Sequence, residues 1–197
     1  MIIAGAGSAG KEALALYLST GKNDVILYDD NKNCEDYIFD KFKVMKTEEE
    51  LKKAIENNPE FCVAIGHPRL RKKVFEKIIA LGGVPRSIVN RDMTYSVSKL
   101  ADNNACIYHP CASISYDFKT GISCLIHSGV VISHKVTLGN FVNVSPSCTI
   151  IGPCEIGDET YLEVGSTILG HHKIGHNAII KAGKVVDRDV MDYETFE

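Results

Sequence analysis

The chain has 197 residues, 45% of them hydrophobic, and a net charge of −3, which fits one large or two small folded domains. Charges of both signs are interspersed, so no basic stripe indicates nucleic-acid binding, and no apolar run approaches the ~18 residues of a membrane span. The chain begins with the strand-like MIIAGAG instead of a charged leader and cleavage site. We therefore expect a cytoplasmic protein.

Residues 1–84 alternate between predicted strands and helices. Thr47 and Glu50 form a capping box, and Pro68 stands in the first turn of a later helix. This alternation predicts an α/β domain, Rossmann-like, with a small parallel sheet covered on both faces. Strands are predicted at 1–4, 25–28 and 61–65, and helices at 11–19, 48–57 and 68–81.

A glycine-rich turn joins the first strand to the first helix. Gly5, Gly7 and Gly10 form a G-x-G-x-x-G pattern, and free N–H groups at a helix start attract phosphate. Asp29 and Asp30 end the second strand about twenty residues on, where a carboxylate commonly bonds a ribose or a base. A tight turn without a ligand is the alternative. The domain offers too few βα units for a full dinucleotide fold, so a mononucleotide or nucleotide-sugar fits better than NAD.

Residues 85–104 are polar and weakly patterned, and we interpret them as a connection with a candidate last strand at 88–89. Beyond them a branched aliphatic residue recurs at every sixth position. From Tyr108 to Val186, twelve of the fourteen sixth positions are Ile, Leu or Val. This period predicts a left-handed parallel β-helix of four to five coils over residues 105–190.

A second period of eighteen residues shows that three hexads make one coil. The glycines that carry it are expected at corners that need a positive φ, and they are Gly121, Gly139, Gly157 and Gly175. Four of the seven cysteines fall two residues before the aliphatic position, where cysteine acts as a small core hydrophobe. They are Cys106, Cys124, Cys148 and Cys154. No C-x-x-C pair occurs, and all seven thiols are expected to be reduced.

His134 is the histidine whose position most favours catalysis. It lies near a predicted corner, and the same position one and two coils later holds Gly152 and Gly170. A neutral imidazole can act as a general base, and a glycine in the next coil leaves room for substrate and exposes an N–H for an oxyanion. For the other histidines of the solenoid, a surface or stacking role is the simpler interpretation.

His109 and His127 also share one position in successive coils, followed by Ser145 and Glu163. Two stacked histidines could bind zinc, as in the γ-class carbonic anhydrases, which share the solenoid fold. A zinc site needs three ligands and an open position, and the sequence offers candidates without a ligand set. We therefore predict no metal.

The whole chain resembles a known family in four stretches: GAGSAGKEAL, LYDD, VAIGHPRLRKKV and VVISHKVTLGNFVNVSPSCTIIG. It is similar to the bacterial nucleotide-sugar N-acetyltransferases that act on 4-amino-4,6-dideoxy sugars and are related to sialic-acid O-acetyltransferases. The resemblance implies a nucleotide-sugar-binding domain at 1–84, a connection at 85–104 and a β-helix acetyltransferase domain at 105–197. It also implies a homotrimer without a metal or an acyl-enzyme.

The resemblance assigns roles to the candidate residues. His134 is the implied general base, the Gly152 amide contacts the thioester oxygen, and Asn143 stands near the acetyl group. Acetyl-CoA is expected in the groove between neighbouring solenoids, with Asn143, Gly152 and Gly170 as its contacts. The nucleotide-linked sugar is expected at the glycine turn and the second strand's end. The expected substrate-binding residues are Gly5, Gly7, Ser8, Ala9, Gly10, Asp29, Asp30 and Gly66.

Three departures from the family pattern stand out. Lys135 follows His134, where relatives often have an acidic residue that raises the basicity of the imidazole. Asp117, one coil earlier, is a candidate to neutralise Lys135. Ala9 stands where many relatives have histidine, and the chain ends at Glu197 without the family's Gly-x-Pro-Ala-Lys segment.

The leading interpretation is an acetyl-CoA-dependent N-acetyltransferase acting on the 4-amino group of a nucleotide-linked amino-dideoxy sugar, for glycan or O-antigen synthesis. The nearest alternative is an O-acetyltransferase acting on sialic acid or another sugar. A catalytically inactive solenoid scaffold and a zinc enzyme are the others. Lys135 favours an amine acceptor over a hydroxyl, since a hydroxyl depends more on a strong base.

Overall fold

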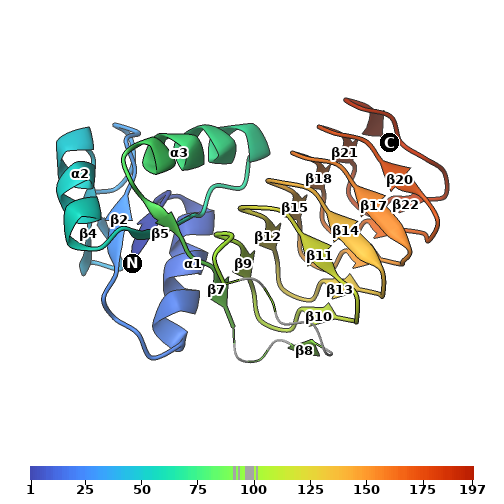
Figure 1. Ribbon diagram of the computed structural model, residues 1–197, viewed down its shortest axis with the longest axis horizontal. Coiled ribbons are helices and arrows are strands. Elements are labelled where there is room, and N and C mark those ends of the chain that lie inside the picture. Colours follow the sequence, from blue (N-terminus) through green and yellow to red (C-terminus); the bar gives the residue numbers. More distant parts are fainter. Residues whose placement is uncertain (91, 93, 96–99, 101) are drawn as a thin grey trace.

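The computed structural model describes residues 1–90, 92, 94–95, 100 and 102–197. A small α/β domain packs against the first coils of a triangular solenoid, and the C-terminus lies at the far end of that solenoid (Figure 1). Both predicted fold classes are confirmed. Within the described part of the chain, no helix is long and apolar enough to cross a membrane.

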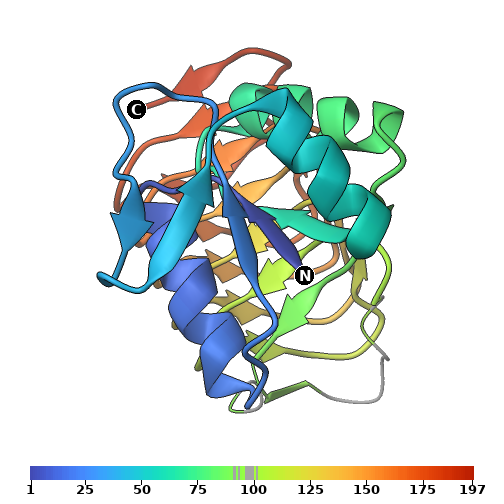
Figure 2. The ribbon, with the colours of Figure 1, turned by 90° about the vertical axis from the view of Figure 1, so that its left-hand side faces the viewer.

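The N-terminal sheet has the strand order β3-β4-β2-β1-β5-β6. The five strands from β4 to β6 are parallel, as predicted, and β3 adds an antiparallel edge to β4. Helix α1 covers one face and helices α2 and α3 the other (Figures 1 and 2). The elements are β1 (Ile2–Ala4), α1 (Ser8–Ser19), β2 (Ile26–Tyr28), β3 (Tyr37–Ile38), β4 (Phe42–Met45), α2 (Glu48–Asn57), β5 (Glu60–Val63), α3 (Pro68–Ala80) and β6 (Val84–Pro85).

Local chemistry explains these elements. Ile2, Ile3 and Ala4 are fully buried because β1 is the centre of a sheet covered on both faces. The capping box of α2 forms as predicted: the Thr47 hydroxyl accepts from the Glu50 N–H at 3.2 Å, and the Glu50 carboxylate accepts from the Thr47 N–H at 3.1 Å. The sequence interpretation missed β3, β4 and β6, which are short and lack a strong alternation.

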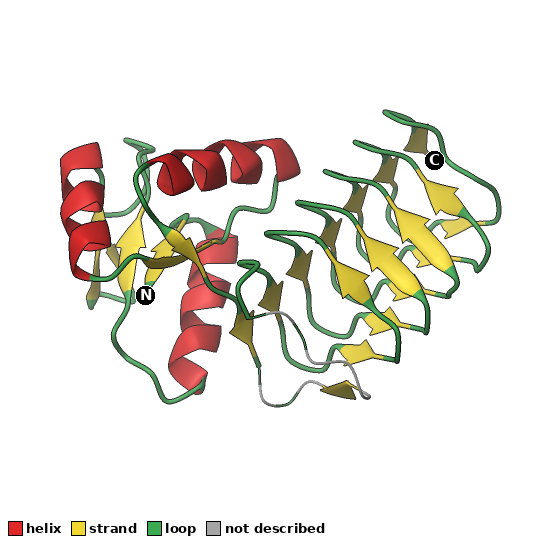
Figure 3. Ribbon diagram, viewed as in Figure 1, coloured by secondary structure: helices red, strands yellow, loops and turns green. Residues whose placement is uncertain are grey.

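The solenoid has three parallel sheets, one on each side of a triangular prism (Figure 3). The first sheet contains β8 (Thr94–Tyr95), β10 (Ser113–Ile114), β13 (Val131–Ile132), β16 (Thr149–Ile150), β19 (Thr167–Ile168) and β22 (Val185–Val186). The second contains β11 (Lys119–Thr120), β14 (Val136–Leu138), β17 (Cys154–Ile156) and β20 (Lys173–Ile174). The third contains β7 (Ile88–Val89), β9 (Ile107–Tyr108), β12 (Leu125–Ile126), β15 (Asn143–Val144), β18 (Tyr161–Leu162), β21 (Ile179–Ile180) and β23 (Thr195–Phe196).

The strand expected at 88–89 is present as β7, and it pairs with β9 of the solenoid. Strand β8 likewise pairs with β10, so part of the segment predicted as a connection extends two solenoid sheets. Positions 91, 93, 96–99 and 101 of that predicted connection lie outside the described residues.

The glycines that recur every eighteen residues are required for a different reason from the one expected. Gly121, Gly139, Gly157 and Gly175 do not adopt a positive φ; a Cβ on Gly157 would instead lie 2.6 Å from the His176 nitrogen and 2.7 Å from the Gly175 carbonyl carbon. The left-handed residues of this corner stand two positions later, at Ser123, Phe141, Glu159 and Asn177. Glycine is required there because successive coils approach closely, not because of its own backbone angle.

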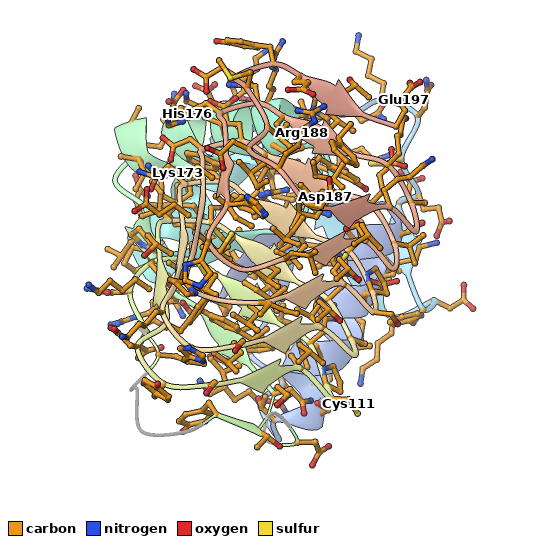
Figure 4. The ribbon with its side chains drawn as sticks, turned by 90° about the vertical axis from the view of Figure 1, so that its right-hand side faces the viewer. Cys111, Lys173, His176, Asp187, Arg188 and Glu197 are labelled. Carbon is orange, nitrogen blue, oxygen red and sulfur yellow. The ribbon has the colours of Figure 1, made fainter. Side chains whose placement is uncertain are left out.

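Side chains at the same corner link each coil to the one before it. The Asn140 amide oxygen accepts from the Ile122 N–H at 3.1 Å, Asp158 accepts from the Asn140 N–H at 2.8 Å, and His176 Nδ1 accepts from the Asp158 N–H at 3.0 Å. Viewed onto the C-terminal end of the solenoid, His176 and Lys173 lie on one side, well away from Cys111 (Figure 4). His176 thus has a structural role in the coil ladder.

A buried arginine joins the two domains. Arg71 of α3 is fully buried and donates to the carbonyl oxygens of Ile65 and Gly66 at 2.6 and 2.8 Å. Across the interface it donates to those of Ser123 at 2.8 Å and Phe141 at 2.5 Å. Burial lowers the pKa of its guanidinium to about 10, so it stays charged at neutral pH. Among the described residues Arg71 has no carboxylate partner, and backbone dipoles alone solvate its charge.

Because successive coils approach closely, substitutions at two solenoid glycines should differ in how much they destabilise the protein. Gly157→Ala should destabilise the protein by about 1–3 kcal/mol, because the new methyl overlaps the next coil. Gly165→Asn should cost less than about 1 kcal/mol, because Gly165 has φ +68°, no atom lies within 4 Å of its added Cβ, and asparagine tolerates that region. Chemical denaturation would measure both. Equal losses would contradict this account.

The arginine also predicts a stability effect. Arg71→Met should destabilise the protein by several kcal/mol, because each buried carbonyl left without a donor costs about 1–3 kcal/mol. Arg69→Met is the control, since Arg69 is exposed on the same helix and bonds Asn177 at the surface. Guanidinium denaturation would compare the two variants. A loss at Arg71 no larger than that at Arg69 would show that the carbonyls do not depend on it.

Candidate functional site

The glycine turn forms one wall of a cavity of about 420 Å³ at the carboxyl ends of β1, β2 and β5. Gly5 has φ +108°, and its added Cβ would lie 2.5 Å from the Ala64 oxygen, so it serves the turn itself. A Cβ on Gly10 would overlap the Gly5 carbonyl. Gly7 differs: nothing lies within 4 Å of its added Cβ. Gly7 therefore leaves open space at the start of α1, next to Ser8 and Ala9.

The start of α1 is available for an anion. Gly7 is its N-cap, no side chain caps it, and no acidic residue stands in its first turn. The free N–H groups of such a helix end favour a phosphate. Gly66 lies across the cavity and also has nothing within 4 Å of its added Cβ. The structure thus places Gly5, Gly7, Ser8, Ala9 and Gly66 around one cavity, whereas Gly10 is not among its lining residues.

The two aspartates of this cavity, Asp29 and Asp30, have different roles. Asp29 accepts from the Ala6 N–H at 2.8 Å and from the Asn31 N–H at 2.9 Å, so it braces the glycine turn. Asp30 accepts from Lys77 at 3.0 Å and from the Tyr28 hydroxyl at 3.2 Å. The Lys77 ammonium lowers the pKa of Asp30. Asp30 is about half exposed, so it remains accessible to a ligand.

Sequence reasoning missed several residues around this cavity. Tyr28 lines it directly before the aspartates, and Lys77 reaches it from α3. Apolar side chains of Leu70 and Val74 form another part of the wall. The Tyr28 position beside LYDD was a usable signal, whereas Lys77 looks in the sequence like any charged residue on a helix surface.

His134 lies at the corner between the first and second solenoid sheets, outside the prism. Its ring stacks on that of Tyr116 one coil earlier, with centroids 5.3 Å apart and planes 11° apart. Its Nδ1 lies 3.1 Å from the Ser133 hydroxyl oxygen. The imidazole is half-buried, which leaves it accessible. Tyr116 and Ser133 were not predicted as contributors, although Tyr116 stands eighteen residues before His134.

Lys135 does not replace the acidic residue of relatives as a partner of the imidazole. Its side chain is exposed, and within the described residues it forms no ion pair, so the suggested neutralisation by Asp117 is not observed. A cavity of about 230 Å³ beside this corner is lined in part by Lys135, Pro153 and His171. The Ser133 hydroxyl is the polar group that orients the imidazole through Nδ1.

Gly152 lies against His134 in the next coil, and the His134 carbonyl fills the side on which a Gly152 side chain would stand. A Cβ at Gly152 would overlap the carbonyl oxygen of His134, so the glycine is needed for the coils to approach. Among the described residues its N–H has no hydrogen-bond acceptor. Gly170 follows one coil later, with its added Cβ position 3.0 Å from the Gly152 oxygen. Substituting Gly152 would therefore disturb the fold as well as any contact of its amide.

Asn143 is not near His134 within one chain. It lies in the third sheet, opposite the His134 corner, at the same coil position as Leu125, which packs against the N-terminal domain. Asn143 is 1% exposed, and its amide nitrogen donates to the Ser145 hydroxyl at 3.0 Å. Its Oδ1 is buried without a hydrogen-bond partner. The structure therefore separates Asn143 from His134, Gly152 and Gly170.

The pair of stacked histidines, His109 and His127, lies close to Asn143. The rings of His109 and His127 stack with centroids 4.9 Å apart, as their spacing predicted, and Glu12 of α1 comes within 3.8 Å of His127 Nδ1. Burial lowers the pKa of His109 to about 4, with a smaller effect from His127. Burial also lowers the pKa of His127, although Glu12 opposes this. Both shifts favour the neutral form of the imidazole.

Comparisons with known proteins agree with this architecture. Residues 1–78 match the PglD N-terminal domain family. PerB from Caulobacter crescentus, solved with CoA and GDP-perosamine, is 25% identical; the match covers 97% of this chain and 90% of that chain, with a TM-score of 0.87. A histidine-to-asparagine variant of perosamine N-acetyltransferase from the same organism is 24% identical, with coverages of 98% and 91% and a TM-score of 0.90.

A third match is the acetyltransferase domain of PglB from Neisseria gonorrhoeae, solved with acetyl coenzyme A. It is 22% identical, with coverages of 98% and 93% and a TM-score of 0.75. Residues 1–78 therefore match the PglD N-terminal domain family, and over almost its full length the chain shares the fold of these N-acetyltransferase structures, which confirms the resemblance drawn from its sequence.

Proposed function

We propose that this protein transfers the acetyl group of acetyl-CoA to an amino group of a nucleotide-linked amino sugar. The observation that carries the proposal is the accessible His134 imidazole, held by Tyr116 and Ser133 beside the unpaired Gly152 amide. PerB was solved with CoA and GDP-perosamine, and the PglB domain with acetyl coenzyme A, which supports both substrates. Perosamine N-acetyltransferase acts on an amine, which favours N-acetylation over O-acetylation.

The geometry around His134 supports direct transfer of the acetyl group. The neutral sugar amine attacks the thioester carbonyl, and Nε2 of His134 accepts the proton that the nitrogen loses. The Ser133 hydroxyl holds Nδ1 and so directs Nε2 outward. The Gly152 N–H donates to the oxyanion. The C–S bond then breaks and CoA leaves as the thiolate, which is protonated to the thiol. No metal and no acyl-enzyme take part.

The nucleotide of the donor sugar docks in the cavity of the N-terminal domain. Its phosphates face the uncapped start of α1, and its base or ribose lies near Asp30. A cavity of about 420 Å³ is in the usual range for a small-molecule site. His134 is not among the residues that line the nucleotide cavity. A single chain therefore does not bring the base and the nucleotide cavity together in one site.

A homotrimer supplies the missing part of the site. His134 projects from a corner, whereas Asn143 and the nucleotide cavity lie on the side of the third sheet, so the corner of one subunit faces that side of its neighbour. Exposed apolar side chains on the first sheet support packing between subunits: Val131 is 45% and Val185 55% exposed. Acetyl-CoA lies in the resulting groove. Seven free cysteines agree with a reducing cytoplasm.

Replacing the base tests the reaction. His134→Ala should lower turnover by roughly 10²–10⁴-fold, the usual contribution of a positioned base, with little change in stability because the ring is outside the prism. His67→Ala, at an exposed histidine of the N-terminal domain, is the control. Release of free thiol from acetyl-CoA, with a panel of nucleotide-linked amino sugars, would measure both. An active His134 variant would remove this residue from the mechanism, as a non-catalytic solenoid predicts.

Removing a carboxylate tests the nucleotide cavity. Asp30→Ala should raise the KM for the sugar nucleotide far more than it lowers kcat, because it removes a binding contact away from the reacting atoms. Asp36→Ala is a matched control, since Asp36 also pairs with a lysine, Lys46, on the same domain. Steady-state kinetics with the sugar nucleotide varied would separate the two constants. An unchanged KM would show that the donor does not contact Asp30.

A further inference from the structure

Lys135 follows the proposed base directly, yet the transfer chemistry gives it no role. Its side chain is exposed, and within the described part of the chain its ammonium has no ion-pair or hydrogen-bond partner. The residue has φ 56° and stands at the corner between the first and second solenoid sheets. A lysine without a partner next to a substrate groove is available to bind an anionic group of a substrate.

The cavity of about 230 Å³ beside this corner carries several nitrogen donors in its wall. The side chains that supply them are Lys135, His171, His172 and Lys173. Lys173 pairs with Glu155 at 3.1 Å, and His172 Nδ1 lies 3.5 Å from Asp189. The His171 side chain is exposed and, among the described residues, has no partner. Lys135 and His171 are therefore the two free donors of this cavity.

The coil register places these two donors relative to the base. His171 occupies the same corner position as Lys135, two coils later, and the second-sheet strands beside them pair in register. Neighbouring parallel strands lie about 4.8 Å apart, so two coils span about 10 Å. The cavity therefore extends away from His134 in the direction of Gly152 and Gly170, along which acetyl-CoA is proposed to lie.

A thioester held at His134 brings phosphate groups toward this cavity. The pantetheine arm of acetyl-CoA joins the thioester to the diphosphate and is long enough to span two coils, whereas the 3′-phosphate lies farther along. An ammonium and an imidazole N–H both donate to phosphate oxygens. Arg188 stands at the same corner, three coils after His134, but its guanidinium is already bonded to Glu194 at 2.6 Å. Lys135 and His171 are thus the donors that a diphosphate would meet.

We propose that Lys135, together with His171, binds the diphosphate of acetyl-CoA at the corner of the subunit that supplies His134. This assignment rests on the proposed function, because it takes the position of the thioester from that of the base. Where relatives often have an acidic residue that acts on the imidazole, this chain has a lysine that acts on the co-substrate. Lys135 therefore controls the affinity for acetyl-CoA and takes no part in the proton transfer.

Calorimetric titration of the full chain with CoA tests the contact. Lys135→Met should weaken CoA binding by roughly three- to tenfold, because it removes one charge pair at a partly exposed site. Lys135→Glu should weaken it further, since it sets a carboxylate beside the phosphates. Lys119→Met is the matched control, at an exposed lysine of the same sheet that does not line the cavity, and should leave binding unchanged. Dephospho-CoA, which lacks the 3′-phosphate, should lose the same factor; a loss seen only with CoA would overturn the assignment to the diphosphate.

An acetyl donor without phosphates separates binding from base chemistry. With acetyl-CoA, Lys135→Met should raise the KM for the donor and leave kcat nearly unchanged. With S-acetylpantetheine, the variant and the unsubstituted protein should have equal kcat/KM, because this donor has no phosphate to lose. An equal loss with both donors would show that Lys135 acts through His134 and would overturn the proposal, as would an unchanged CoA affinity of Lys135→Met. An unsubstituted protein that binds no CoA would overturn the proposed function as well.

Discussion

The guanidinium of Arg71 fixes how the two halves of this protein meet. It bonds two carbonyls of the loop after β5 and two carbonyls from successive solenoid corners. The same loop contains Gly66, which lines the nucleotide cavity. One buried cation therefore sets the position of that cavity relative to the solenoid. A lysine would provide one point charge, whereas the planar fork of arginine reaches both domains at once.

The stacking of coils turns positions in the sequence into columns in space, and the proposed active groups lie in such columns. Tyr116, His134, Gly152 and Gly170 follow one another at eighteen-residue intervals along one corner. Each has a separate physical reason for its place. Tyr116 packs on the imidazole, and Gly152 permits the approach of the His134 carbonyl while its own N–H stays free. The site thus depends on the close contact of successive coils.

The sequence predicted those features that repeat or that have a local cause. The six-residue period predicted the solenoid, and the capping box of Thr47 and Glu50 predicted the residue at which α2 starts. The sequence showed the glycines that recur every eighteen residues, but the reason given for them, a positive φ, was wrong. A close approach between successive coils cannot be seen in the sequence alone. Strands β3 and β4 were missed because their pairing depends on the rest of the sheet.

Contacts between the domains could not be predicted at all. Arg71 looks in the sequence like one of several basic residues on a helix, yet it is fully buried. Glu12 likewise belongs to a helix whose relation to His127 is set only by the docking of two separately folded units. Asn143 was expected near the acetyl group, and the fold places it across the prism from His134 of the same chain. Such relations depend on side-chain packing between elements that are far apart in the chain.

The fixed coil length has a consequence for how such a chain can change in size. An insertion or deletion of eighteen residues adds or removes one coil and returns every later side chain to its original face. A change of one residue within a strand would turn inward side chains outward in every later coil, unless a loop absorbed it. The first coils are constrained further, because the N-terminal domain packs against that end of the solenoid (Figure 1).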